Sequence, residues 1–125
     1  MQNNAMRDGL TRYIHKTYGA KPDFPWLKYP SYAVFRHGDN KKWFAVILDV
    51  PRQKLGLKGD GAVDIINLKC GQALLGSLLM TEGFLPAYHM NKEHWVSVLL
   101  DGTVDKENIC GLIDVSFMNT GKKTK

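Results

Sequence analysis

The sequence predicts an α+β fold, in which a mostly antiparallel sheet of about five strands carries helices on one face. Two observations lead to this fold class. Apolar residues recur at helical spacing in three segments, whereas short runs rich in β-forming residues make up five others. These segments follow one another in the order α-β-β-β-α-β-β-α without an internal repeat, and strands joined by short turns pair as antiparallel neighbours.

The first element is an amphipathic helix over residues 5–18, followed by Gly19 as a stop. Three prolines and three aromatic residues alternate in the segment 21–30, which cannot continue a helix and should run extended along the edge of the core. We expect Trp26 and Tyr29 to pack inward as a lid, because large rings gain most from burial. An exposed aromatic surface remains the alternative.

Residues 32–37 and 43–50 are predicted strands, and the loop of Gly, Asp, Asn and Lys between them indicates a β-hairpin. This hairpin is the densest basic feature outside the C-terminal tail; it carries Arg36, His37, Lys41 and Lys42. A solvated loop whose lysines discourage edge-to-edge aggregation is the alternative interpretation.

No regular element is predicted for residues 52–61, and their glycines and lysines lack the order of a phosphate-binding loop. Residues 62–69 form the third strand. A short helix follows over residues 70–80, with an apolar face of leucines, and Gly83 is expected to end it.

Residues 84–90 are expected to be extended, and Asn91 should cap one helical turn through His94. The strand 95–100 is apolar on both sides, which predicts a central position in the sheet and places Trp95 in the core. Asp105 then caps a final helix whose apolar stripe includes Ile109, Leu112, Ile113 and Phe117, with Ser116 among them.

With 125 residues, 44% of them hydrophobic, the chain is expected to form one domain over residues 1–120, with a disordered basic tail at 121–125. A cytoplasmic location is expected, because no apolar run is long enough for a membrane span and the first residues lack a secretory signal. Cys70 and Cys110 are expected to be buried free thiols.

The net charge of +5 is unevenly distributed. Residues 21–58 carry eight basic and three acidic side chains, whereas residues 59–120 carry three basic and eight acidic ones. This asymmetry suits a polyanionic partner, and it equally suits contacts between copies of the chain.

Two histidines, His89 and His94, lie in the polar stretch 86–95, yet their spacing of five fits a metal site on neither a helix nor a strand. Neither Ser97 nor Ser116 has the context of a catalytic nucleophile. We therefore predict no enzyme activity, no catalytic residue, no metal and no cofactor, and we interpret the histidines as hydrogen-bonding struts.

The spacing of seven residue types in this stretch resembles the MmcQ/YjbR family of small bacterial proteins. The matching residues are Pro86, Tyr88, His89, Asn91, Lys92, His94 and Trp95. The resemblance continues through the strand to Asp101-Gly102 and extends over most of residues 5–119; it is weaker over 21–30 and 52–61. It implies a topology similar to secretion chaperones and a DNA-binding role of the kind called double-wing.

Two functions follow as expectations. The first is DNA binding, with phosphates contacting Arg36, Lys41, Lys42, Lys69 and Lys92. The second is a protein- or peptide-binding module or homodimer without nucleic-acid activity, which would use the face of the sheet.

Overall fold

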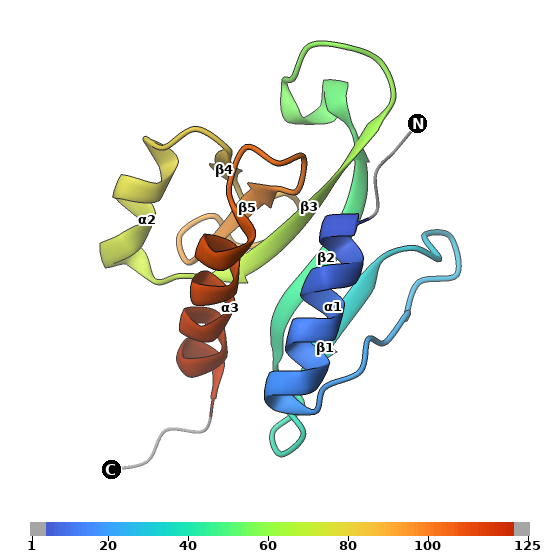
Figure 1. Cartoon of the computed structure of the whole chain (residues 1–125). Helices are drawn as coiled ribbons and strands as arrows, with labels where there is room; N and C mark the ends of the chain where they lie inside the picture. Colours follow the sequence, from blue (N-terminus) through green and yellow to red (C-terminus); the bar gives the residue numbers. More distant parts are fainter. Residues whose placement is uncertain (1–4, 122–125) are drawn as a thin grey trace.

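The computed structural model describes residues 5–121, which contain three α-helices, one short 3₁₀ helix and five strands (Figure 1). The predicted order of helices and strands is confirmed, with α1 (Ala5–Tyr18), β1 (Ala33–Arg36), β2 (Trp43–Pro51), η1 (Arg52–Leu55), β3 (Ala62–Lys69), α2 (Gln72–Leu79), β4 (Phe84–Pro86), β5 (Trp95–Leu99) and α3 (Lys106–Thr120). The disordered basic tail was predicted over residues 121–125, and residues 122–125 lie outside the described part of the chain.

All five strands belong to one antiparallel sheet in the order β1-β2-β3-β5-β4. The hairpin of β1 and β2 is confirmed, with an irregularity in register between Phe35 and Arg36. As predicted, β5 is an interior strand. The register also fixes which strand ends lie together: Arg36 pairs with Trp43, and Lys69 pairs with Trp95.

One face of the sheet is covered by α1 and α3 (Figure 1). The core beneath these helices is built on fully buried side chains, including Leu10, Ile14, Phe35, Phe44, Ile66, Ile109 and Ile113. Phe44 is surrounded by rings: its centroid lies 5.8 Å from that of Tyr18 and 5.0 Å from that of Phe117, both in edge-to-face geometry. Aromatic pairs of this kind add stability beyond the area they bury.

Helix α3 is attached to the sheet by polar contacts as well as by packing. Asp105 caps its first turn, as predicted, by accepting a hydrogen bond from the Asn108 amide at 2.8 Å. Further along, the buried Ser116 hydroxyl donates to the Phe44 carbonyl at 2.5 Å and accepts from the Lys69 amide at 2.8 Å. The serine within the apolar stripe is therefore a bridge between α3 and two strands.

On the opposite face of the sheet, here called the open face, no α-helix of residues 5–121 contributes to the apolar packing. A second apolar cluster lies there, in which Val46, Leu48 and Ile65 are buried. The proline-rich segment crosses its edge, where Asp23 forms an isolated bridge with Val34. Trp26 is half-buried, so the predicted lid forms in part, but Tyr29 remains 51% exposed and its predicted inward packing is wrong.

Gly83 was expected to end the second helix, but α2 ends at Leu79 and Gly83 occupies a turn before β4. Its φ of +95° lies in a region that side chains disfavour. A Cβ atom at this position would lie 2.5 Å from Cγ2 of the buried Val104. Glycine is therefore required here by the turn and by the close approach of the loop between β5 and α3.

Both cysteines are free, as predicted; Cys70 is buried, whereas Cys110 is only half-buried. Burial raises the pKa of both thiols, which keeps them protonated and poorly nucleophilic at neutral pH. Within residues 5–121, no helix has both the length and the apolar character needed to cross a membrane.

Candidate nucleic-acid interface

The pairing of the strands gathers the predicted basic residues at one end of the sheet. Strand β1 ends at Arg36, β2 starts at Trp43, β3 ends at Lys69, and Lys69 pairs with Trp95 at the start of β5. Lys41 and Lys42 lie in the turn between β1 and β2, and Lys92 lies in the turn before β5. We call these five residues the basic end: Arg36, Lys41, Lys42, Lys69 and Lys92.

The hairpin turn is held in place by the C-terminal end of α3. Asn40 donates from Nδ2 to the Thr120 carbonyl at 3.2 Å, and its Oδ1 accepts from the Lys42 amide at 2.8 Å. Lys41 adopts a left-handed conformation with φ of 62°. Both lysines are exposed, so their charges extend from a turn with a defined backbone.

His37 does not belong to the exposed part of this hairpin, contrary to the sequence interpretation. Its side chain is only 4% exposed, and its Nε2 lies 2.8 Å from the Thr120 hydroxyl oxygen. The ring also packs on Phe117, with centroids 4.1 Å apart. His37 therefore joins β1 to α3 and adds no solvent-facing charge.

Arg36 lies on the open face and has partners of its own. Its guanidinium is 3.2 Å from the Asp23 carboxylate and 5.7 Å from the centroid of the Trp43 ring. Its buried Nε has no hydrogen-bond partner within the described residues. Arg36 also lines a hollow of about 380 Å³ together with Lys21 and Lys41, so three cations meet at this corner.

The turn that follows β4 is built on a buried network at the open face. The Asn67 side chain donates to the Tyr88 carbonyl at 2.9 Å and accepts from the Ser97 hydroxyl at 2.5 Å. The same hydroxyl accepts from the Tyr88 amide at 2.9 Å. Asn67 and Ser97 are both fully buried, so two strands hold the backbone of Tyr88 in one position.

Asn91 ties the second half of this turn, as predicted, because its Oδ1 accepts from the Glu93 amide at 2.7 Å. The predicted role of the histidines as struts is wrong: among residues 5–121, neither imidazole forms a hydrogen bond. His89 instead is exposed, has φ of 58°, and lies edge-on to Tyr88 with centroids 4.0 Å apart. Side-chain clusters able to hold a metal ion are absent from the described part of the chain.

Trp95 was expected in the core, but it is half-buried and belongs to neither apolar cluster. It lies on the open face, beside Lys69 on the neighbouring strand. Both faces of β5 carry apolar residues, and this pattern predicted that every residue of the strand is buried. Trp95 is the first residue of the strand and lies at the margin of the sheet, so it is only half-buried.

An aromatic cavity of about 190 Å³ occupies the centre of the open face. Five tryptophan and tyrosine rings line it, together with the imidazole of His89. We call these five the aromatic box: Trp26, Tyr29, Tyr32, Trp43 and Tyr88. Its floor is formed by the buried Val46, Leu48 and Asn67. This cavity was not predicted; the signal available was the alternation of prolines and aromatic residues in segment 21–30.

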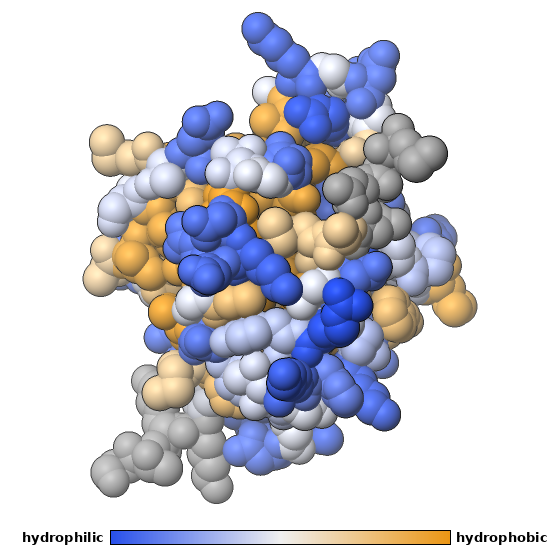
Figure 2. All heavy atoms as spheres, in the orientation of Figure 1, coloured by the Kyte–Doolittle hydropathy of each residue, from blue (hydrophilic) through white to orange (hydrophobic). Residues whose placement is uncertain are grey.

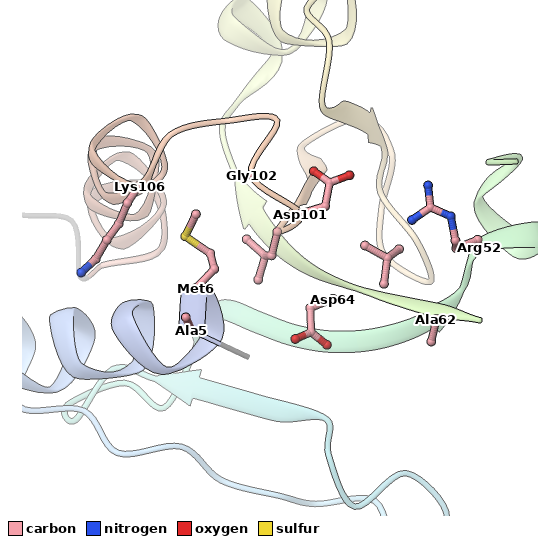
Figure 3. Close-up of a pocket in the computed structure, with 10 residues that line it drawn as sticks. Ala5, Met6, Arg52, Ala62, Asp64, Asp101, Gly102 and Lys106 are labelled. Atoms are coloured by element: carbon pink, nitrogen blue, oxygen red, sulfur yellow. The ribbon is translucent and has the colours of Figure 1, made fainter. Parts of the chain in front are cut away.

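A second hollow, of about 490 Å³, lies at the opposite end of the sheet (Figure 3). Asp64 and Asp101 face it, while Arg52 and Lys106 lie on opposite sides of it. Arg7 pairs with Asp64 at 3.3 Å, so charge is partly neutralised at this end. Carboxylates and basic side chains therefore lie together at this end of the sheet, which is mixed in charge.

Comparisons with known proteins agree with this fold and name no activity. A family model described as YjbR matches residues 15–118. The uncharacterized protein YyaQ of Bacillus subtilis is 46% identical over 111 residues, covering 89% of this chain and 94% of that protein. A crystal structure of a Pseudomonas syringae protein is 50% identical with a TM-score of 0.90, covering 92% of this chain and 98% of that one. A crystal structure of a Deinococcus radiodurans protein with the domain DUF419 is 26% identical, with a TM-score of 0.71. The match covers 94% of this chain and 79% of that one.

Proposed function

Because the chain belongs to the YjbR family, we propose that it is a non-enzymatic DNA-binding protein whose basic end contacts phosphates. The observation that carries this proposal is the strand register, which brings five basic side chains from distant parts of the sequence to one end of the sheet. Lysine and arginine clustered on one surface are the electrostatic signature of phosphate recognition.

The four lysines of the basic end are available for phosphates. Lys41, Lys42 and Lys92 are exposed and Lys69 is half-buried, and none of the four has a carboxylate partner among residues 5–121. Arg36 shares its charge with Asp23 and is the weakest of the five as a phosphate contact. Because a free ammonium gains more from a phosphate than a paired one, the lysines should supply most of the affinity.

The charges of the whole molecule favour one orientation on DNA. Asp64, Asp101, Asp105 and Glu107 lie at the end of the sheet where β3 and α3 begin, opposite the basic end. Asp39 and Glu93 are the acidic exceptions within the basic turns. Because Arg7, Arg52 and Lys106 lie at the same end as these carboxylates, that end is mixed in charge. The basic end, which has fewer carboxylates, is the better candidate to approach a polyanion.

Salt titration of a labelled DNA duplex tests this proposal. With ~5 phosphates neutralised, log affinity should fall with log salt at a slope of about −4 to −5. Lys42→Gln and Lys92→Gln should each reduce the magnitude of the slope by about 0.9. Lys106→Gln is the matched control, because Lys106 lies at the start of α3, away from the basic end.

Binding that does not respond to salt, or an equal loss in all three variants, would show that the basic end is not the contact surface. Absence of binding to duplex and single-stranded DNA alike at low salt would refute the DNA-binding role itself.

A second candidate function, self-association, is favoured by the composition of α2. This helix is rich in leucine, yet only Leu75 is buried, while Leu79 and the adjacent Met80 are 38% and 90% exposed. Figure 2 shows hydrophobic residues gathered over the α2 region at the left of the molecule. A second copy of the chain could cover this apolar surface.

Light scattering over a range of protein concentrations tests this second candidate. We expect the mass to rise toward that of a dimer, and Met80→Glu to return it to that of a monomer. Leu27→Glu is the control, since Leu27 is 98% exposed in a different segment. A monomeric mass at every concentration would exclude the dimer.

A further inference from the structure

The aromatic box is adjacent to a second, more polar hollow of about 360 Å³. Tyr29, Tyr32, Tyr88 and His89 line both cavities and so form a shared wall between them. Lys28 and Lys54 line the polar side, together with one carboxylate, Asp49, which accepts a hydrogen bond from the Ser31 hydroxyl. An apolar ring-lined site and a cationic site therefore meet along one wall.

Trp26 meets two rings of the box edge to face, whereas Tyr29 and Tyr32 stack on each other with centroids 4.7 Å apart and 16° between their planes. Trp26 meets Trp43 at an interplanar angle of 88° and Tyr32 at 77°, with centroids 5.6 Å and 5.9 Å apart. The two tryptophans therefore do not stack on each other, while each tyrosine of the stacked pair covers one face of the other. Faces of aromatic rings are the surfaces on which planar heterocycles bind.

Polar groups at the box are few and have defined positions. Asn67 lies at the floor with its carboxamide already bonded to Ser97 and Tyr88, which fixes its orientation. Burial, with smaller contributions from Tyr88 and Asp49, raises the pKa of Tyr32, so its hydroxyl stays a neutral hydrogen-bond donor at physiological pH. His89, at the rim, has a left-handed backbone, a conformation that in non-glycine residues is often found at functional sites.

Size limits what the box can hold. Its volume of about 190 Å³ is below the ~300–1,000 Å³ typical of sites for drug-sized ligands. One planar ring system fits this volume better than a larger cofactor. Cations at the neighbouring hollow favour a ligand that carries a negative charge next to its ring.

From this juxtaposition we propose that the aromatic box binds one unstacked nucleobase, while Lys28 and Lys54 contact an adjacent phosphate. The inference rests on the proposed nucleic-acid function and makes it more specific, because a base inside a duplex cannot enter the box. The protein should therefore prefer single strands to duplexes.

The position of the box agrees with a strand lying along the open face. Trp43 belongs to the box and also contacts Arg36 of the basic end, so the two sites are continuous at β2. Lys28 and Lys54 lie on the other side of the box. A single strand could thus contact cations before and after the base that it inserts.

The test compares four ligands of defined chemistry at one salt concentration: a short oligo(dT), the same strand with abasic sites, its duplex with oligo(dA), and the mononucleotide dTMP. Binding is measured by anisotropy and by tryptophan fluorescence. Oligo(dT) should bind at least tenfold more tightly than the abasic strand and the duplex, and a stacked base should quench the fluorescence of the box.

Trp26→Leu should weaken oligo(dT) binding roughly 5- to 140-fold, which is the effect of losing one stacked base, and should leave binding of the abasic strand unchanged. Phe24→Leu is the matched control, because Phe24 belongs to the same segment but is 52% exposed and does not line the box. Lys54→Gln should reduce the magnitude of the salt slope for single strands by about 0.7.

The outcomes separate this inference from the function on which it rests. Equal affinity for oligo(dT), the abasic strand and the duplex, or an unchanged Trp26→Leu variant, would overturn the base-binding site and leave DNA binding intact. Affinity for dTMP equal to that for oligo(dT) would assign the box to free nucleotides and overturn the single-strand preference. Failure of all four ligands to bind would refute the proposed function together with the inference.

Discussion

Replacing Phe44 with alanine is expected to lower the free energy of unfolding by about 3–5 kcal/mol. The side chain is fully buried in the core under α1 and α3, and rings approach it from several elements. Removing it forfeits the transfer free energy of the ring and leaves a cavity that the neighbouring rings can fill only in part. Since domains are stable by ~5–15 kcal/mol, much of the total stability would be lost.

Urea unfolding followed by tryptophan fluorescence measures this effect as a lower midpoint at an unchanged m-value. Phe24→Ala is the control, because the same ring at a 52% exposed position should change stability by no more than about 0.5 kcal/mol. Equal effects of the two substitutions would mean that Phe44 does not organise the core.

The prediction from sequence succeeded where a local pattern determines a local structure. Helix α1 follows from its apolar stripe and the glycine after it, and β3 follows from a run of β-forming residues. Asp105 was identifiable as a cap because a carboxylate before an apolar stripe satisfies the free amides of a first helical turn.

Positions at the margins of the sheet were harder to predict. His37 is polar and follows a strand, which suggested exposure, but α3 returns to that point and Thr120 supplies its hydrogen-bond partner. Trp95 was placed in the core from the character of its strand, although it begins that strand beside Lys69. In both cases a residue far away in sequence decides the environment, and a local pattern carries no information about it.

In the candidate site, too, local features were predictable, whereas contacts between distant segments were not. The five basic residues were chosen as exposed cations, and their meeting at one end depends on the strand order, which places β5 beside β3. The aromatic box draws its rings from the proline-rich segment, the residue before β1, β2 and the turn after β4. Such a cavity is a property of tertiary structure and could not be predicted from any one of these segments.

Removing the carboxamide of Asn67 should have the second large effect. Asn67→Ala is expected to destabilise the protein by about 2–4 kcal/mol, because it leaves the Tyr88 carbonyl and the buried Ser97 hydroxyl without their partner. The turn that begins at Tyr88 should loosen as well, since Asn67 and Ser97 are what hold its backbone to the sheet. Amide hydrogen exchange at Tyr88 should then accelerate more than exchange in α1.

A double-mutant cycle with Ser97→Ala tests whether these groups act as one network. Ser97→Ala alone leaves the Tyr88 amide and the Asn67 Oδ1 atom without their hydrogen-bond partner, which should lower the free energy of unfolding by about 1–3 kcal/mol. Because each single variant already breaks the shared hydrogen bond, the double variant should cost less than the sum, with a coupling of roughly 0.5–3 kcal/mol. Additive losses would show that Asn67 and Ser97 stabilise the protein independently, and that the position of Tyr88 at the aromatic box does not depend on their contact.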